Sequence, residues 1–239
     1  MRVFSYSVEQ FSLKFRVVRK YPRYLDTLAV HINQPQLPAL TRRFLFDQLN
    51  KNAEITSDDD VNLEDCPEIE GKISVFHSAI ASFFAPSDDC GLRGLRRERI
   101  RSCPLWRGKA ERRDCALIVE DEDKPGMRGM NVARVRLFFS FSHNGKKYPC
   151  ALVEWFSRIG RSPDHETGMW KVQVRPDIRQ DQRLRSVIHL DSFLRGAHLL
   201  PIFGHNFLPV NFDHTYSLDA FAGYYVNHFA DHHSHEIIF

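Results

Sequence analysis

The dipeptide Asn144-Gly145 most constrains how this chain can fold, because it stands between two stretches of β-strand character. In residues 134–141 apolar side chains occupy every second position, which is the period of a strand with two distinct faces. Asn-Gly readily adopts the positive φ angles of a type I′ turn, the tight connection between antiparallel strands. Residues 148–156 then supply the returning strand. The sequence therefore predicts an antiparallel β-hairpin.

Four further stretches favour strands, namely residues 73–85, 116–120, 169–174 and 186–190. They are rich in β-branched and aromatic residues, and turn-forming residues separate them. Short strands of this kind favour a small antiparallel barrel or sandwich over a parallel sheet. We expect an α+β fold, in which a small antiparallel β-barrel is flanked by N-terminal and C-terminal helices.

Helical patterns stand on both sides of these strands. Residues 37–49 carry apolar side chains at helical spacing, and residues 24–30 favour an earlier short helix. Near the C-terminal end, Asp191 is a suitable N-cap for a helix over 192–200, and Ser217 is one for a helix to about residue 235.

A strongly acidic stretch divides the N-terminal helices from the strands. Residues 54–70 hold eight Asp or Glu and no Lys or Arg, which is typical of a solvated linker. The resulting division is an N-terminal helical segment (1–52), an acidic linker (53–71), a β-barrel-like domain (72–190) and C-terminal helices packed on the barrel (191–239).

Composition excludes several classes of protein. With 239 residues, 43% of them hydrophobic, the chain is an ordinary globular polypeptide without low-complexity repeats. The five cysteines form no C-x-x-C pair, which favours reduced thiols in an intracellular compartment. No apolar run is long enough to span a bilayer, so we expect no membrane partner. We find no P-loop, G-x-G-x-x-G or G-x-S-x-G motif, and we expect no small-molecule substrate and no cofactor.

Positive charge is concentrated in residues 93–113, although the whole chain has a net charge of only +3. Lys and Arg neutralise phosphates, so we take the basic side chains of this segment as candidate DNA-binding residues: Arg93, Arg96, Arg97, Arg99, Arg101, Arg107, Lys109, Arg112 and Arg113. Trp106 lies among them and could stack on an unpaired base or anchor the segment. The same arginines could equally pair with the acidic stretch.

The C-terminal tail is rich in histidine. His228, His232, His235 and Glu236 would share one face of a helix, and histidines four residues apart can bind zinc together. The Glu of an H-E-x-x-H motif is missing, and a polar helix end explains the same residues. We therefore assign no metal site and retain these four residues as weak candidates. No residue is a candidate for catalysis, because the runs of carboxylates resemble solvated loops.

Many segments of the chain, in order from about residue 12 onward, resemble the C-terminal region of fungal Plavaka-type transposases, of the Kyakuja–Dileera–Zisupton superfamily. The resemblance rests on residues 19–28 (RKYPRYLDTL), 37–49 (LPALTRRFLFDQL), 73–79 (ISVFHSA), 84–88 (FAPSD), 96–101 (RRERIR), 125–130 (PGMRGM), 133–140 (ARVRLFFS), 151–156 (ALVEWF), 164–170 (DHETGMW), 187–204 and 217–236.

The resemblance implies a role with transposon or chromatin DNA in the nucleus. It also implies an RNase H-like catalytic domain with Asp- and Glu-bound Mg²⁺, which would lie upstream of these segments. We therefore expect a truncated or decayed copy that is not an enzyme. The barrel resembles in outline the BAH-type barrels of chromatin proteins, an analogy of architecture alone.

An alternative function is a protein-interaction or chromatin-reading module without DNA contact, or a homodimer. A reader of this kind needs exposed aromatic side chains around a cation, and the nearest ones to the hairpin are Tyr148, Trp155, Phe156 and Trp170.

Overall fold

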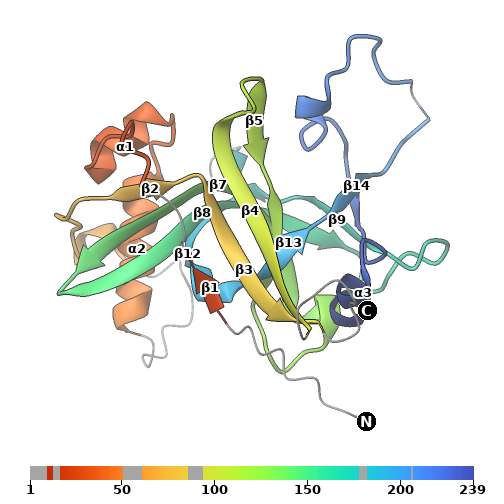
Figure 1. Ribbon diagram of the computed structural model, residues 1–239, viewed down its shortest axis with the longest axis horizontal. Coiled ribbons are helices and arrows are strands. Elements are labelled where there is room, and N and C mark those ends of the chain that lie inside the picture. The colour runs from red at the N-terminus through yellow and green to blue at the C-terminus, as the bar shows by residue number, and fades with distance from the viewer. Residues whose placement is uncertain (1–9, 13–16, 51–60, 86–93, 178–181, 206) are drawn as a thin grey trace.

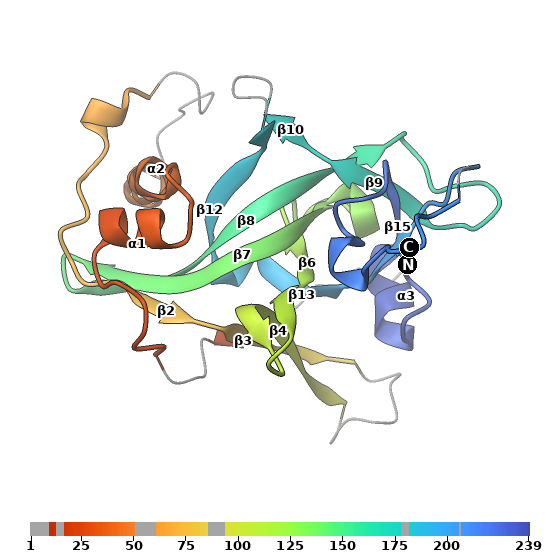
Figure 2. The same ribbon diagram turned by 90° about the horizontal axis from the view of Figure 1, so that it is seen from above.

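A long central hairpin organises the molecule. The computed structural model describes residues 10–12, 17–50, 61–85, 94–177, 182–205 and 207–239. Its two longest strands, β7 (Met130–His143) and β8 (Lys146–Ile159), run side by side through the middle (Figures 1 and 2). Asn144 and Gly145 join them with φ angles of 49° and 76°, and His143 pairs with Lys146. The hairpin predicted from the sequence is confirmed.

The remaining strands are shorter. They are β1 (Gln10–Ser12), β2 (Ser74–Phe76), β3 (Ser78–Phe84), β4 (Leu95–Trp106), β5 (Ala110–Arg113), β6 (Cys115–Val119), β9 (Trp170–Val174), β10 (Pro176–Asp177), β11 (Gln182–Arg183), β12 (Arg185–His189), β13 (Phe193–Ala197), β14 (Leu199–Pro201) and β15 (Tyr224–Val226). The strands predicted at 116–120, 169–174 and 186–190 correspond to β6, β9 and β12. The stretch predicted as one strand at 73–85 is divided at His77 into β2 and β3.

Because β7 and β8 are so long, each has two different neighbours along its outer edge. β6 pairs with the first half of β7 and β2 with the second half, whereas β12 and β9 divide β8 in the same way. The main sheet has the order β13-β6-β7-β8-β9-β15-β14, and a second sheet has the order β1-β3-β4-β5. A register shift between Val135 and Leu137 marks an irregularity of the kind that bends a strand. The result is a nearly closed antiparallel β-barrel in an α+β fold, as the sequence predicts.

Three hydrophobic clusters hold the fold together. The barrel interior contains Phe138 and Phe193, whose ring centres are 6.1 Å apart. A second cluster lies under the N-terminal helices, where Phe44 contacts Phe141 edge to face. A third lies under the C-terminal segment around Tyr224. Each such fully buried side chain contributes about 2–3 kcal/mol, so the three clusters together fix the barrel and its coverings.

The N-terminal helices form where the sequence predicts them. α1 (Leu25–His31) and α2 (Leu37–Leu49) lie on one side of β7 and β8 (Figure 2). The described part of the acidic segment, residues 61–71, has exposed carboxylates and also packs against α2. Its short 3₁₀ helix Leu63–Asp65 contacts α2, and Arg42 donates hydrogen bonds to the carbonyls of Leu63 and Cys66 at 2.9 and 2.7 Å. Residues 51–60 lie outside the described ranges.

The C-terminal region departs most from the predictions. Residues 192–200 do not form a helix, because β13 and β14 occupy them and β13 pairs with β6. The predicted helix over 217–235 is also wrong, since β15 pairs with β9 there. Within the described residues 207–239, the only α-helix is α3 (His232–Ile238). The barrel sheet therefore extends well past residue 190. α3 begins at His232 because the Asp231 side chain accepts a hydrogen bond from the Ser234 amide at 2.7 Å.

Four cysteines in the described ranges, Cys66, Cys103, Cys115 and Cys150, are free thiols and buried. Burial raises the pKa of Cys115 to about 12, so this thiol stays protonated at neutral pH. Cys90 lies outside the described ranges. Over the same ranges no helix combines the length and the apolar character that crossing a membrane requires.

Candidate nucleic-acid interface

The Arg-rich segment folds as the hairpin β4–β5, which projects from the barrel in Figure 1. Arg107 and Gly108 form its turn with positive φ angles of 52° and 74°, and the Lys109 amide donates to the Trp106 carbonyl at 3.1 Å. A register shift between Cys103 and Trp106 marks a bulge just before the turn. Residues 95–114 hold eight Lys or Arg against three acidic residues, so the hairpin has a net charge of +5 in a chain of +3.

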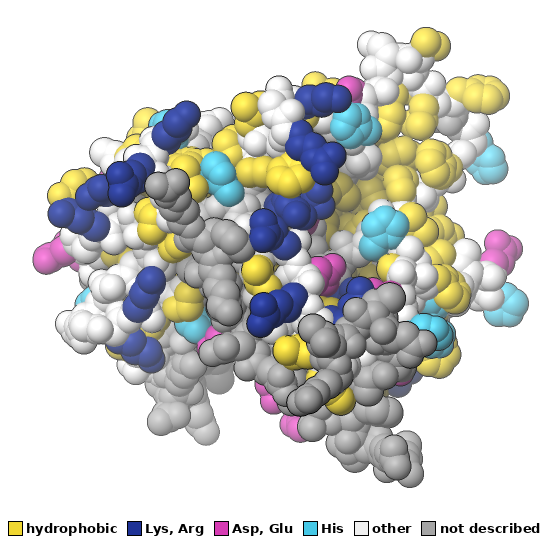
Figure 3. Space-filling model, in the orientation of Figure 1, with side chains coloured by type: hydrophobic (Ala, Val, Ile, Leu, Met, Phe, Trp, Pro, Cys, Tyr) yellow, Lys and Arg dark blue, Asp and Glu magenta, His cyan; other side chains and the backbone are white. Residues whose placement is uncertain are grey.

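Alternation along β4 sorts its arginines onto two faces. Arg97 and Arg99 are exposed and Arg101 is half-buried, all on the outer face. Arg96 lies on the other face with the buried Ile100. Arg107 and Lys109 at the turn are exposed, and together with the outer face of β4 they form a band of positive charge, which we call the hairpin band. Figure 3 shows Lys and Arg side chains gathered over these strands.

Three arginine side chains surround the ring of Trp106. The guanidinium carbons of Arg101, Arg112 and Arg107 lie 4.6, 5.2 and 5.5 Å from the ring centre. Burial and the nearby Arg112 charge lower the pKa of Arg101, the effect expected where cations are crowded together. Asp114 offsets part of this charge through its ion pair with Arg112 at 2.7 Å. The half-buried indole therefore positions arginines, which favours anchoring over base stacking.

Arg113 is turned inward and supports the hairpin. Its Nη1 donates to the Ser102 hydroxyl and to the Arg136 carbonyl, both at 2.9 Å. Its Nε pairs with Glu111 at 3.2 Å. The side chain is only 13% exposed, so Arg113, although predicted to bind DNA, is largely buried and stabilises the hairpin. Arg93, another predicted residue, lies outside the described ranges.

A second basic stretch adjoins the hairpin, and the sequence reasoning did not assign it to DNA. Residues 17–23 run beside β2, where the Val18 amide donates to the Val75 carbonyl at 2.9 Å. Tyr21 meets His77 with 3.4 Å between its hydroxyl and Nε2, and the His77 carbonyl accepts from the Ser102 amide of β4 at 2.8 Å. The exposed cations of this stretch are Arg19, Lys20 and Arg23. Their clustering in the sequence was the available signal, but its position beside the hairpin required the fold.

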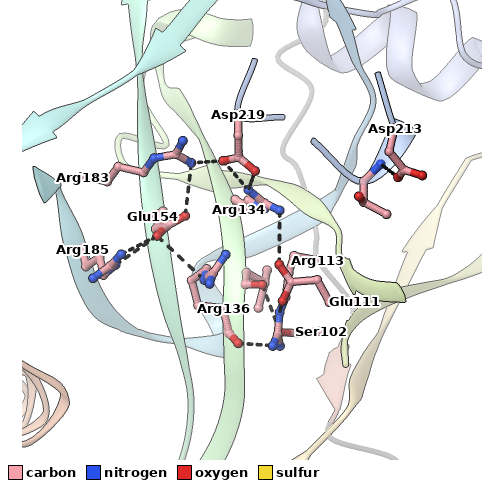
Figure 4. Close-up of polar contacts among 12 residues, drawn as sticks. Ser102, Glu111, Arg113, Arg134, Arg136, Glu154, Arg183, Arg185, Asp213 and Asp219 are labelled. Carbon is pink, nitrogen blue, oxygen red and sulfur yellow. Dashed lines mark hydrogen bonds and ion pairs between the residues drawn. The ribbon is translucent and has the colours of Figure 1, made fainter. Parts of the chain in front are cut away.

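A buried charge network lies beneath the hairpin (Figure 4). Glu154 is 3% exposed and accepts two hydrogen bonds from Arg185, at 2.8 and 3.0 Å. Arg134 is 4% exposed and binds both carboxylate oxygens of Asp219, at 3.0 and 3.1 Å. Arg183 joins the two halves, because it lies 2.6 Å from Asp219 and 3.7 Å from Glu154. The network connects the hairpin's base to the segment that follows β14.

A cleft of about 480 Å³ lies between the hairpin and the C-terminal segment. Arg99 and Arg112 stand on its hairpin side, and Arg195 of β13 lies at its opposite wall. Arg195 is 5% exposed and is held by Asp231 through hydrogen bonds of 2.7 and 2.8 Å and by Glu98 at 3.3 Å. The cleft therefore has arginine side chains on its hairpin side, whereas Asp231 and Glu98 neutralise the charge of Arg195 in its interior.

The acidic stretch has no part in this surface where it is described. Residues 61–70 lie with α2 on the far side of β7 and β8 from β4 (Figure 2). The alternative in which the Arg-rich segment pairs with the acidic stretch thus finds no support in residues 61–70.

The histidine tail forms an aromatic cluster. His228 is 2% exposed, and its ring centre lies 5.1 Å from that of His235. Its Nδ1 has no hydrogen-bond partner among the residues that the structure describes. Burial, with a smaller effect of His235, lowers the pKa of His228. His232 and Glu236 are exposed. Throughout the described ranges, no group of three or more His, Cys, Asp or Glu side chains is arranged to hold a metal ion.

The aromatic residues considered for a cation cage are largely inside the protein. Tyr148, Phe156 and Trp170 are each at most 4% exposed. Trp155 is half-buried, and its indole nitrogen donates to the Ser186 hydroxyl at 2.9 Å. Because a cage needs exposed ring faces, these four side chains do not form one.

Comparisons of the chain with protein-family models, with curated proteins and with solved structures found no match.

Proposed function

We propose that this chain is a non-catalytic nucleic-acid-binding module that holds DNA phosphates on the hairpin band. The observation that carries the proposal is the gathering of Arg101, Arg107 and Arg112 around Trp106, in a hairpin of net charge +5. Guanidinium groups present rigid forks of donors that match phosphate oxygens, which makes arginine well suited to this role.

Charge crowding supplies the driving force. Like charges held close together repel one another, and a phosphate placed among them relieves that repulsion while it releases counterions from the DNA. The adjoining cations Arg19, Lys20 and Arg23 would extend the contact along the backbone. Phosphate contacts carry little sequence information, so we expect weak sequence preference and strong salt dependence.

The family resemblance gives this binding a context. We propose that the chain is the C-terminal module of a Plavaka-like transposase, acts in the nucleus and binds transposon or chromatin DNA. The catalytic residues of such an element would then lie in another part of the transposase.

Salt-dependent binding of a labelled DNA duplex, measured by fluorescence anisotropy, tests the proposal. The variant Arg97→Gln/Lys109→Gln removes two exposed charges from the hairpin band. The control Lys146→Gln/Lys147→Gln removes two exposed charges at the β7–β8 turn, far from β4 in Figure 1. Both variants carry the same net charge, so they separate a local contact from a general effect of charge.

The hairpin variant is expected to weaken binding and to reduce the slope of log K against log salt by about 2, since each lost phosphate contact reduces it by about 0.9. The control is expected to reduce it much less. Equal effects of the two variants, or no binding by the wild type at about 50 mM salt, would overturn the proposal.

An exposed apolar loop favours a second function, contact with a protein partner. Phe207 and Val210 are completely exposed, and Phe203 and Tyr216 are 66% and 63% exposed, in the segment between β14 and β15. We propose that this loop contacts a second copy of the chain. Sedimentation equilibrium over a wide range of concentrations tests it, because Phe207→Asp/Val210→Asp should abolish self-association. A wild type that stays monomeric throughout would exclude the homodimer.

A further inference from the structure

A second cationic surface lies away from the hairpin band. A pocket of about 480 Å³ is lined by four arginines that come from separate parts of the chain. Arg128 belongs to the short 3₁₀ helix Gly126–Arg128, Arg158 and Arg161 lie at the end of β8, and Arg175 follows β9. We call it the four-arginine pocket.

The charge of this pocket is largely uncompensated. Among the residues that the structure describes, Glu120 is the one acidic residue in the lining, and its Oε2 accepts a hydrogen bond from Asn131 at 2.6 Å. The lining therefore has a net charge of +3. Within the part of the chain that the structure describes, the guanidinium groups of Arg128, Arg161 and Arg175 have no acidic partner at ion-pair distance. Four cations that share one acidic neighbour in a single hollow repel one another, which favours an anionic ligand.

Two of the arginines are held in place by the fold. Arg158 donates from Nη1 to the Met127 carbonyl at 2.7 Å, and its guanidinium carbon lies 6.0 Å from the Trp170 ring centre. The backbone of Arg175 is fixed by its amide, which donates to the Trp155 carbonyl at 2.9 Å, and by its carbonyl, which accepts from the Leu184 amide at 2.8 Å. These contacts fix the backbone around the pocket, while the arginine side chains themselves are exposed to solvent.

We propose that the four-arginine pocket binds a phosphate group. Arginine forks match the oxygen geometry of phosphate, and a phosphate dianion would compensate most of the +3 charge. The pocket shares no lining residue with the cleft beside the hairpin. β9 and β10, which flank Arg175, lie on the other side of β7 and β8 from β4 (Figure 2). The proposal is therefore independent of the proposed function of the hairpin band.

Two sources of the phosphate group are distinguished by two titrations of the full chain. Pyrophosphate, titrated by calorimetry at low salt, represents a free phosphate ligand. A short single-stranded oligonucleotide, followed by anisotropy over a range of salt concentrations, represents a nucleic-acid backbone. The test variant is Arg161→Gln/Arg175→Gln, which replaces two exposed side chains of the pocket. The control is Lys146→Gln/Lys147→Gln, which removes the same charge elsewhere.

If the ligand is a free phosphate compound, the wild type and the control bind pyrophosphate, and the test variant binds it about tenfold more weakly or worse. If it is a nucleic acid, pyrophosphate binds too weakly to measure, but the test variant reduces the salt slope for the oligonucleotide by about 1.4 relative to the control. The proposal is overturned if the test variant and the control agree in both titrations. A variant of the hairpin band that loses DNA binding is expected to bind pyrophosphate as the wild type does.

Discussion

Replacing Glu154 with glutamine should destabilise the protein substantially. Glu154 is 3% exposed and faces Arg185 at 2.8 Å, Arg183 at 3.7 Å and Arg136 at 3.8 Å. Glutamine keeps the shape of the side chain but removes its charge. The three arginines, each less than a third exposed, then lack their shared anion. Among the described residues, only Arg183 retains another acidic partner at ion-pair distance, namely Asp219.

The magnitude follows from this geometry. Removing one partner of a buried ion pair costs about 3–5 kcal/mol, because a desolvated charge is left uncompensated. The partial exposure of the arginines places this variant near the lower limit, at about 3 kcal/mol. In a chain of this length such a loss lowers Tm by about 6–12 °C.

Urea unfolding followed by tryptophan fluorescence measures the effect. The control is Glu122→Gln, an exposed carboxylate, which should stay within about 0.5 kcal/mol of the wild type. Adding Arg185→Met to Glu154→Gln should recover at least about 1 kcal/mol relative to the sum of the single changes, since the uncompensated cation is then removed. A Glu154→Gln variant as stable as the control would refute the argument.

Three further predictions concern the pH dependence, the loop before β7 and the hairpin band. Burial and the neighbouring Arg195 lower the pKa of His233 to about 4, so the folded state keeps this ring neutral while the unfolded chain protonates it below about pH 6.5. The free energy of unfolding holds the full contribution of the neutral ring above pH 6.5 and should fall by about 3 kcal/mol by pH 4 in urea titrations. The His233→Phe variant preserves the stacking on Phe83, and its free energy of unfolding should fall less over the same pH range. Gly129→Ala should lower the free energy of unfolding by more than about 2 kcal/mol in thermal or urea unfolding, because a Cβ would overlap the carbonyl oxygens of Asp121 and Lys124. Its control, Gly204→Ala, places a Cβ in open space and should leave the free energy of unfolding nearly unchanged. Trp106→Ala should weaken duplex binding about three- to tenfold, because the arginines around the ring lose their common support. Trp106→Phe keeps an aromatic ring and should retain most of the affinity. Unchanged binding by the alanine variant would contradict the anchoring role.

The sequence predicts those elements whose patterns are local. The helix Leu37–Leu49 and the β7–β8 hairpin follow from apolar periodicity and from the Asn144-Gly145 turn. The sequence predicts a helix where β13 lies, because this strand is buried on both faces and lacks the alternation of a half-exposed strand. Phe193 enters the barrel interior and the adjacent Leu194 enters the C-terminal cluster, so its apolar residues do not alternate as they do in a half-exposed strand.

The candidate site was only partly accessible to sequence reasoning. The concentration of charge in residues 93–113 is visible in the sequence, but the separation of Arg97 from the inward-facing Arg113 depends on strand pairing. The contact between Arg134 and Asp219 joins residues 85 positions apart, and no local pattern indicates it. The four-arginine pocket has the same character, because its members are dispersed over the chain and meet only in the folded barrel.

The pairing of β13 with β6 and of β15 with β9 has a consequence for biosynthesis. The partners of both pairs are separated by long stretches of chain, so β13 and β15 follow β6 and β9 only after those stretches have been synthesised. Until then the edges of β6 and β9 stay without their strands, and unpaired edges promote aggregation. We therefore expect the barrel to close only after β15 has left the ribosome, and to need protection by chaperones during the interval.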